Sequence, residues 1–103
     1  MSRVSVRVPT PLRDFVEGRD EVEVAGGTVA ESLETLVERY PRLRRHLLEE
    51  GGEVREYVNL YVNEEDVRHL GGLSAPLSEG DVLTIVPSIA GGVEAEGDRR
   101  VSV

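Results

Sequence analysis

Few side chains in this sequence have a type and spacing suited to catalysis. The chain of 103 residues has no cysteine, which excludes a disulfide scaffold, a thiolate metal site and a cysteine nucleophile. His46 and His69 are far apart and match no metal-binding spacing, so we expect both to be solvated surface histidines. The acidic groups at 49–50 and 64–66 are expected at a helix end and in a turn, not as an acid–base pair. The sequence therefore predicts a protein that is not itself an enzyme.

Glycine pairs occur four times, at 26–27, 51–52, 71–72 and 91–92. The first three fall between expected elements, where glycine supplies turn geometry. The fourth pair differs, because it lies just beyond an expected core strand on a segment with no further periodicity. Two residues without side chains can thread a narrow channel, so a carboxylate exposed at Gly92 can reach a nucleotide site in another protein. We therefore interpret Gly92 as the candidate reacting group.

The charge balance limits the partners of this chain. It has 12 basic and 20 acidic residues, which give a net charge of −8 and a pI near 4.7. Nucleic acids and anionic membranes bind clustered basic residues, so we expect neither as a partner. No apolar run is long enough to span a bilayer, and no signal-peptide pattern precedes the first strand. We therefore expect a single cytoplasmic domain.

Alternating apolar and polar residues predict the strands that position the glycine pair. Residues 4–8 alternate, with three valines facing inward, and residues 21–24 alternate again. These two segments are expected to form a hairpin, with a loop beginning at the prolines of 9–11. Residues 57–63 and 82–86 predict two further strands. The last of these strands leads directly towards Gly91–Gly92.

One long amphipathic helix is expected between the second and third strands. Thr28 and Glu31 form a capping box, and an apolar stripe at helical spacing runs to Tyr40. Pro41 is expected to end this helix, because the residue before a proline avoids helical geometry. A second, shorter helix is expected over 42–50, with Gly51 as its stop. The segment that follows the third strand is expected to be a polar turn and an irregular loop.

This order of elements predicts an α+β fold in which a mixed sheet packs on one main helix. The first and last strands are expected to pair in parallel at the centre of the sheet, which is the ubiquitin-like β-grasp arrangement. We place the β-grasp domain at residues 1–87. The periodicity is lost after Pro87, and residues 93–103 cannot bury enough apolar surface to order themselves, so residues 88–103 are expected to form a flexible C-terminal tail, with a removable extension at 93–103.

Several stretches of the sequence match those of a known family. They are Val6–Arg13, Thr28–Val29, Tyr40–Arg44, Val58–Asn63 with Glu65–Arg68, and Gly80–Asp81 leading to Pro87–Gly92. Together they resemble the ubiquitin-like sulfur carriers of the MoaD/ThiS superfamily, which includes the small subunit of molybdopterin synthase and the thiamin sulfur carrier. The chain looks most similar to the carriers of thiocarboxylate-dependent cysteine biosynthesis.

The resemblance implies a mechanism and a set of partners. An E1-like adenylylating and sulfurtransferase enzyme, using ATP and Mg²⁺, would adenylylate the carboxylate of Gly92. A sulfur donor would convert this group into a thiocarboxylate. A sulfur-accepting biosynthetic enzyme would then take the sulfur for cysteine, molybdopterin or a related product. The chain itself would bind no cofactor and no metal.

The sequence departs from the family pattern after the glycine pair. Such carriers usually end at the second glycine, whereas Val93–Val103 follow here, so Gly92 has no free carboxylate as written. We hypothesise a precursor that is cut between Gly92 and Val93 by a JAMM-type, zinc isopeptidase-like metalloprotease. The alternative is that the extension leaves the protein an inactive paralogue or a binding module.

Partner docking is expected beside the tail. Val86 is predicted to face outward at the end of the last strand, with Ile89, Ala90 and Gly91 completing the contact, although scattered exposed apolar residues are also common. Two other functions remain open. A ubiquitin-like modifier would be joined through Gly92 to target lysines, and a non-covalent interaction domain would not use Gly92 at all. Since the chain has no lysine, it cannot build lysine-linked chains on itself.

Overall fold

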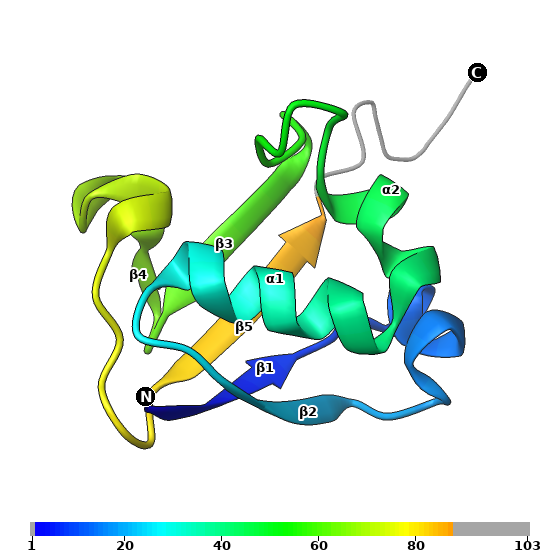
Figure 1. The fold of residues 1–103 in the computed structure, drawn as a ribbon, viewed down its shortest axis with the longest axis horizontal. Coiled ribbons are helices and arrows are strands. Elements are labelled where there is room, and N and C mark those ends of the chain that lie inside the picture. Colours follow the sequence, from blue (N-terminus) through cyan, green and yellow to red (C-terminus); the bar gives the residue numbers. More distant parts are fainter. Residues whose placement is uncertain (1, 88–103) are drawn as a thin grey trace.

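The computed structural model describes residues 2–87 and is drawn in Figure 1. The predictions for Ile89, Ala90, Gly91, Gly92 and Val93, and that of a flexible tail, lie outside these residues. The strands are β1 (Arg3–Arg7), β2 (Glu21–Ala25), β3 (Val58–Val62), β4 (Glu65–Asp66) and β5 (Val82–Pro87). The α-helices are α1 (Val29–Arg39) and α2 (Arg44–Leu47). The 3-10 helices are η1 (Thr10–Val16), η2 (Pro41–Leu43), η3 (Val67–His69) and η4 (Gly72–Ser74).

The described strands form one mixed sheet in the order β2-β1-β5-β3-β4. β1 and β5 pair in parallel at its centre, whereas the other neighbours pair antiparallel. Helix α1 lies across one face of the sheet (Figure 1). The predicted parallel pairing of the first and last strands, and the β-grasp arrangement, are therefore confirmed.

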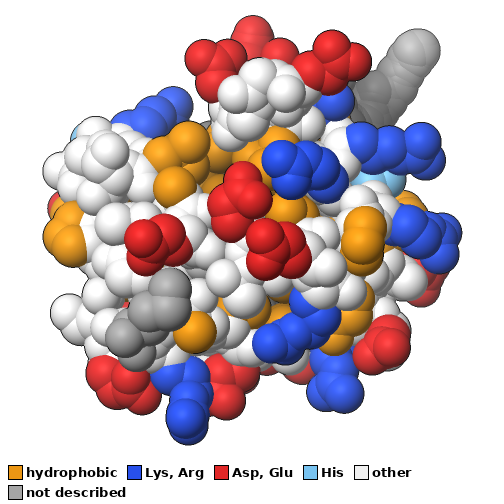
Figure 2. Space-filling view, viewed as in Figure 1, with side chains coloured by type: hydrophobic (Ala, Val, Ile, Leu, Met, Phe, Trp, Pro, Cys, Tyr) orange, Lys and Arg blue, Asp and Glu red, His pale blue; other side chains and the backbone are white. Residues whose placement is uncertain are grey.

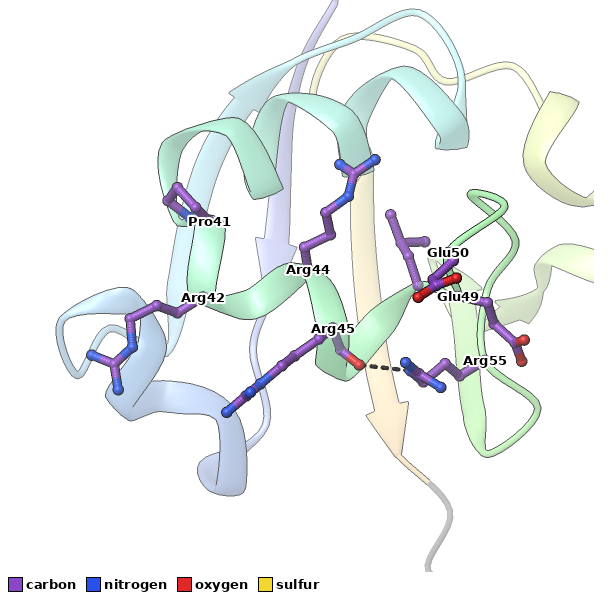
Figure 3. Close-up of a pocket in the computed structure, with 8 residues that line it drawn as sticks. Pro41, Arg42, Arg44, Arg45, Glu49, Glu50 and Arg55 are labelled. Atoms are coloured by element: carbon purple, nitrogen blue, oxygen red, sulfur yellow. Dashed lines mark hydrogen bonds between the residues drawn. The ribbon is translucent and has the colours of Figure 1, made fainter.

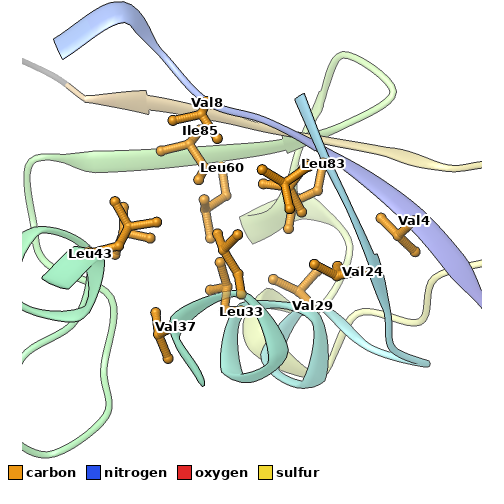
Figure 4. Close-up of a cluster of buried hydrophobic side chains, with 14 of the residues drawn as sticks. Val4, Val8, Val24, Val29, Leu33, Val37, Leu43, Leu60, Leu83 and Ile85 are labelled. Carbon is orange, nitrogen blue, oxygen red and sulfur yellow. The ribbon is translucent and has the colours of Figure 1, made fainter. Parts of the chain in front are cut away.

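The core lies between the sheet and α1, and it follows the alternation seen in the sequence (Figure 4). Val4 and Val6 of β1, and Leu83 and Ile85 of β5, are at most 1% exposed. The predicted helical stripe from Val29 to Val37 is buried against them, which removes its apolar surface from water. No helix within residues 2–87 has the length and apolar character needed to cross a membrane.

The start of α1 uses the predicted capping box with one difference. The Glu31 N–H donates to Thr28 Oγ1 (3.2 Å), which satisfies one of the free amides at the helix start. The Glu31 carboxylate accepts from the N–H of Gly27 (2.7 Å), one residue earlier than the box predicts. The helix ends at Arg39, just before Pro41, as expected.

Two of the predicted elements were wrong in their extent. The segment after β1 is not a plain loop, because it forms a seven-residue 3-10 helix, η1, that begins after Pro9 and buries Leu12 and Val16. The second helix does not run over 42–50. It ends at Leu47, because Leu48 turns to extended geometry and bridges to Val54.

The segment after β3 is also more ordered than predicted. Asn63 and Glu64 make the turn with positive φ angles of 49° and 78°, and Glu65–Asp66 then pair back onto β3 as β4. The predicted irregular loop contains η3 and η4. The predicted tight turn before β5 is confirmed, since the Asp81 N–H donates to the Ser78 carbonyl (3.0 Å).

Candidate functional site

The candidate site is the end of β5, from which the chain continues towards the glycine pair. β5 pairs with β1 on one side and with β3 on the other. Its last residue, Pro87, lies opposite Val58, and the buried Leu83 and Ile85 anchor the strand in the core. The body of the protein therefore holds the base of the downstream segment at a fixed place.

Val86 faces away from the core at this end of the strand. Its neighbour Ile85 is 1% exposed, whereas Val86 is 40% exposed, as the alternation predicts. Its cross-strand partner is Asn59 on β3. The prediction that Val86 is an outward apolar residue is confirmed, and its role in partner binding stays a prediction.

Tyr57 is the second large hydrophobic residue that the described structure leaves exposed, at 43%. It directly precedes Val58, which pairs with Pro87, so Tyr57 and Val86 both lie near the end of β5. We call these two residues the exit patch. Tyr57 falls in the strand predicted over residues 57–63, but no feature of the sequence indicates a function for it. The pairing of β3 with β5, which brings it to the site, is not visible in the local sequence.

The two histidines have different surroundings. The ring of His46 stacks on Phe15, with centroids 4.4 Å apart and an interplanar angle of 25°. Its Nε2 is buried and has no hydrogen-bond partner within residues 2–87. The prediction of a solvated His46 was therefore wrong, because the 3-10 helix that covers it was not foreseen. His69 is exposed, as predicted.

The acidic residues at 64–66 have a structural role, as predicted. Asp66 caps η3, accepting from the Arg68 N–H (2.9 Å), and forms an ion pair with the Arg68 guanidinium (2.6 Å). The side-chain hydrogen bond from Arg68 is the main reason that the pKa of Asp66 falls to about 2. The same contact raises the pKa of Arg68. No cluster of three or more His, Cys, Asp or Glu in the described part of the chain is arranged to hold a metal ion.

The sheet order, the single long helix and a last strand leading to a glycine pair define a ubiquitin-like β-grasp protein. Comparison with known proteins identifies the family within this class. Residues 6–92 match the ThiS family, so the chain belongs to that family. The match includes Gly91 and Gly92, and Val93–Val103 fall outside it.

Individual relatives agree with this assignment. The sulfur carrier protein CysO of Mycobacterium tuberculosis is 37% identical over 91 residues, covering 86% of this chain and 98% of the relative. A chain in the crystal structure of the Amycolatopsis orientalis BexX/CysO complex superposes with a TM-score of 0.79 and 42% identity, covering 86% of this chain and 99% of that one. The small archaeal modifier protein 1 of Methanosarcina acetivorans gives a TM-score of 0.81 and 31% identity, covering 89% and 98%. The resemblance to the sulfur carriers is confirmed.

Proposed function

We propose that this chain is a sulfur carrier whose reacting group is the carboxylate of Gly92, exposed by hydrolysis of the Gly92–Val93 bond. The observation that carries the proposal is the family match, which ends at Gly92. This residue is five positions beyond Pro87, the last residue of a strand held on both sides. A metalloprotease of the JAMM type is the class of enzyme we expect to make the cut.

The chemistry needs no side chain from the carrier. The Gly92 carboxylate would attack the α-phosphorus of ATP in an E1-like enzyme, where Mg²⁺ accompanies the nucleotide, and pyrophosphate would leave. Reduced sulfur from a donor would then displace AMP and give a thiocarboxylate. A biosynthetic enzyme for cysteine, molybdopterin or a related compound would use that sulfur as a nucleophile, and water would restore the carboxylate. We place these steps in the cytoplasm, where ATP is supplied.

The short distance along the chain restricts how a partner can approach. Five residues span at most about 17 Å when fully extended. The entrance to a partner's nucleotide site must therefore lie within about this distance of Pro87, so the surface around that entrance meets the body of the carrier. The exit patch of Tyr57 and Val86 lies in this contact zone. A few residues near the centre of such a contact, often Trp, Tyr or Arg, contribute most of its binding free energy, and the residues around them exclude water.

Intact-mass measurement of the protein purified from its own host tests the main proposal. The expected result is a form that has lost 93–103, part of which carries one sulfur-for-oxygen exchange. A Gly92→Ala variant produced in the same way is expected to lack the sulfur. Finding only the 103-residue mass under all growth conditions would exclude the activation mechanism, as would an unchanged phenotype for Gly92→Ala.

The role of the exit patch has a separate test. We expect Val86→Asp in the Gly92-ended form to raise the KM for the activating enzyme about tenfold, the effect of losing a contact of about 1.4 kcal/mol. Ala25→Asp is a matched control, because Ala25 is exposed at the end of β2 and the charge change is the same. Equal KM values for both variants would remove Val86 from the docking surface.

Protein modification is the second candidate function, because the chain superposes on a small archaeal modifier protein at 31% identity. This use requires the same adenylylated Gly92 but a lysine amine as the acceptor. Tryptic digestion of host proteins would then show a remnant of the tail joined to target lysines. Such adducts, without any thiocarboxylate form of the free protein, would favour the modifier.

A further inference from the structure

Arginine side chains gather beside the end of β5, although the chain as a whole carries a net charge of −8. Arg42, Arg44, Arg45 and Arg55 line one open hollow of about 680 Å³ (Figure 3). The remaining lining residues are Pro41, Leu48, Glu49 and Glu50. Four arginines and two glutamates give this hollow a local excess of positive charge. Figure 2 shows blue side chains on the side of the molecule that carries α2.

Three of these arginines form no ion pair with another residue that the structure describes. Arg44 lies 3.8 Å from the Glu34 carboxylate, whereas no ion pair within residues 2–87 involves Arg42, Arg45 or Arg55. Glu49 and Glu50 line the same hollow without pairing with them in this part of the chain. We call Arg42, Arg45 and Arg55 the arginine cluster.

Neutral contacts hold part of the arginine cluster in place. The Nε–H of Arg55 donates to the Arg45 carbonyl (2.6 Å), which orients that guanidinium (Figure 3). The guanidinium of Arg42 lies 5.3 Å from the centroid of the Phe15 ring. Neither contact neutralises the charge. An arginine side chain that is already oriented loses less conformational freedom on binding, so these guanidinium groups are preorganised to bind carboxylates.

The arginine cluster lies close to the base of the segment that carries Gly92. The Val58 N–H donates to the Arg55 carbonyl (3.0 Å), and Val58 pairs with Pro87. Tyr57 lies between Arg55 and Val58 in the chain, so the exit patch and the arginine cluster adjoin the same end of β5. A partner that receives Gly92 must approach within about 17 Å of Pro87, which places its surface over this region.

We propose that the arginine cluster is a docking surface for an acidic segment of the protein that receives Gly92, an inference that rests on the proposed function. A guanidinium group can donate two parallel hydrogen bonds to an Asp or Glu carboxylate. Complementary charge also raises the association rate and favours one orientation of the partner. Most of the acidic residues of the chain lie outside the hollow and repel such a segment, although Glu49 and Glu50 in its lining, and Glu53 and Glu56 beside Arg55, reduce its positive charge. An acidic partner is therefore directed to the end of β5 and not to other faces of the carrier.

The kinetic test uses the Gly92-ended form and pairs of substitutions with equal charge change. Arg42→Gln/Arg45→Gln removes two exposed members of the cluster, and Arg3→Gln/Arg19→Gln removes two exposed arginines elsewhere. ATP–pyrophosphate exchange by the host's activating enzyme is measured against carrier concentration at low and high NaCl. We expect the cluster variant to lose about tenfold in kcat/KM at low salt and much less at high salt, because salt screens surface charges. The control variant is expected to stay within about twofold of the unsubstituted form.

Two outcomes of this assay overturn the proposal. One is equal behaviour of the two variants, and the other is a loss in the cluster variant that salt does not change. If the unsubstituted Gly92-ended form supports no exchange at all, the proposed function fails instead.

A direct binding measurement is independent of that enzyme. A hexaglutamate peptide is titrated into the full 103-residue chain and followed by NMR of the arginine Nε–H groups. Shifts confined to Arg42, Arg45 and Arg55 and abolished in the cluster variant support the proposal. The absence of shifts there, or stronger binding of a single-stranded oligonucleotide of equal charge, refutes docking of an acidic protein segment.

Discussion

Gly26 connects β2 to α1 at a point where the backbone passes very close to the helix. Its N–H donates to the Ser2 carbonyl (2.9 Å), which fixes the loop against the start of β1. A Cβ added at Gly26 would lie 2.6 Å from Ser32 Oγ, 2.8 Å from Ser32 N and 3.0 Å from Ser32 Cα. Two of these three atoms are backbone of the first turn of α1, so rotating a side chain cannot relieve the contact. We therefore expect Gly26→Ala to displace the helix from the sheet.

The expected loss follows from known effects of overpacking. Forcing an extra carbon into a closely packed site costs about 1–3 kcal/mol in the free energy of unfolding. Ser32 is fully buried and α1 covers the core, so the site has little freedom to relax. We therefore expect Gly26→Ala to lower the free energy of unfolding by about 2 kcal/mol. In a domain of this size each kcal/mol changes the melting temperature by about 4–8 °C, which gives a decrease of roughly 8–16 °C.

Urea and thermal unfolding followed by circular dichroism measure this effect, with Gly51→Ala as the control. A Cβ at Gly51 would meet no atom within 4 Å, so this variant is expected to be neutral or up to about 1 kcal/mol more stable. Adding Ser32→Ala to Gly26→Ala removes the contact with Oγ but keeps the two backbone contacts, so only partial rescue is expected. If Gly26→Ala unfolds with the same midpoint and m-value as the unsubstituted chain, the close approach is not a real constraint.

Three further predictions concern the body of the protein. Because the pKa of Asp66 is lowered to about 2, its ionised form stabilises the fold above pH 3.8, and this contribution disappears as the pH falls towards 2. In Asp66→Asn, the free energy of unfolding should depend less on pH over that range, as measured by urea unfolding in acid buffers. Leu36→Ala empties a fully buried site and should lower the free energy of unfolding by about 2–5 kcal/mol in urea titrations. Asn63 has a positive φ, and its side chain donates to the Asp81 carboxylate and accepts from the Val82 N–H. Asn63→Ala loses both hydrogen bonds and should lower the melting temperature by about 4–16 °C. An unchanged melting temperature would show that both bonds are dispensable.

Local patterns in the sequence were sufficient to predict β1, β2, β3, β5 and the main helix, but not the short strand β4. The parallel pairing of β1 with β5 was predicted from the order of the elements, by analogy with the β-grasp topology. The alternation of β1 and β5 identified the buried valines and the outward Val86, because each strand has one face on the core. Thr28 and Pro41 identified the ends of α1, because a cap and a proline act within one turn. These signals depend only on near neighbours in the chain.

The features that were missed depend on contacts between distant segments. His46 is half-buried with its Nε2 enclosed, and its ring stacks on Phe15, about thirty positions earlier, a contact that no local rule reports. Tyr57 reaches the candidate site through the pairing of β3 with β5. The arginine cluster is assembled partly by the hydrogen bond between Arg55 and the Arg45 carbonyl, which closes a loop of ten residues. The sequence predicted Gly92 as the reacting group, but it did not predict the surface near the end of β5.

The central position of β5 has a consequence for the synthesis of this protein. β1 and β3 are both made before β5, yet each needs β5 as its neighbour to complete the sheet. Because pairing the ends of a chain is a slow, long-range step, the core is expected to close only after residue 87 has left the ribosome. The domain that precedes the glycine pair therefore cannot complete its fold until nearly all of the protein has been translated. Incomplete chains ending before β5 would expose the apolar faces of both neighbouring strands and become substrates for proteolysis.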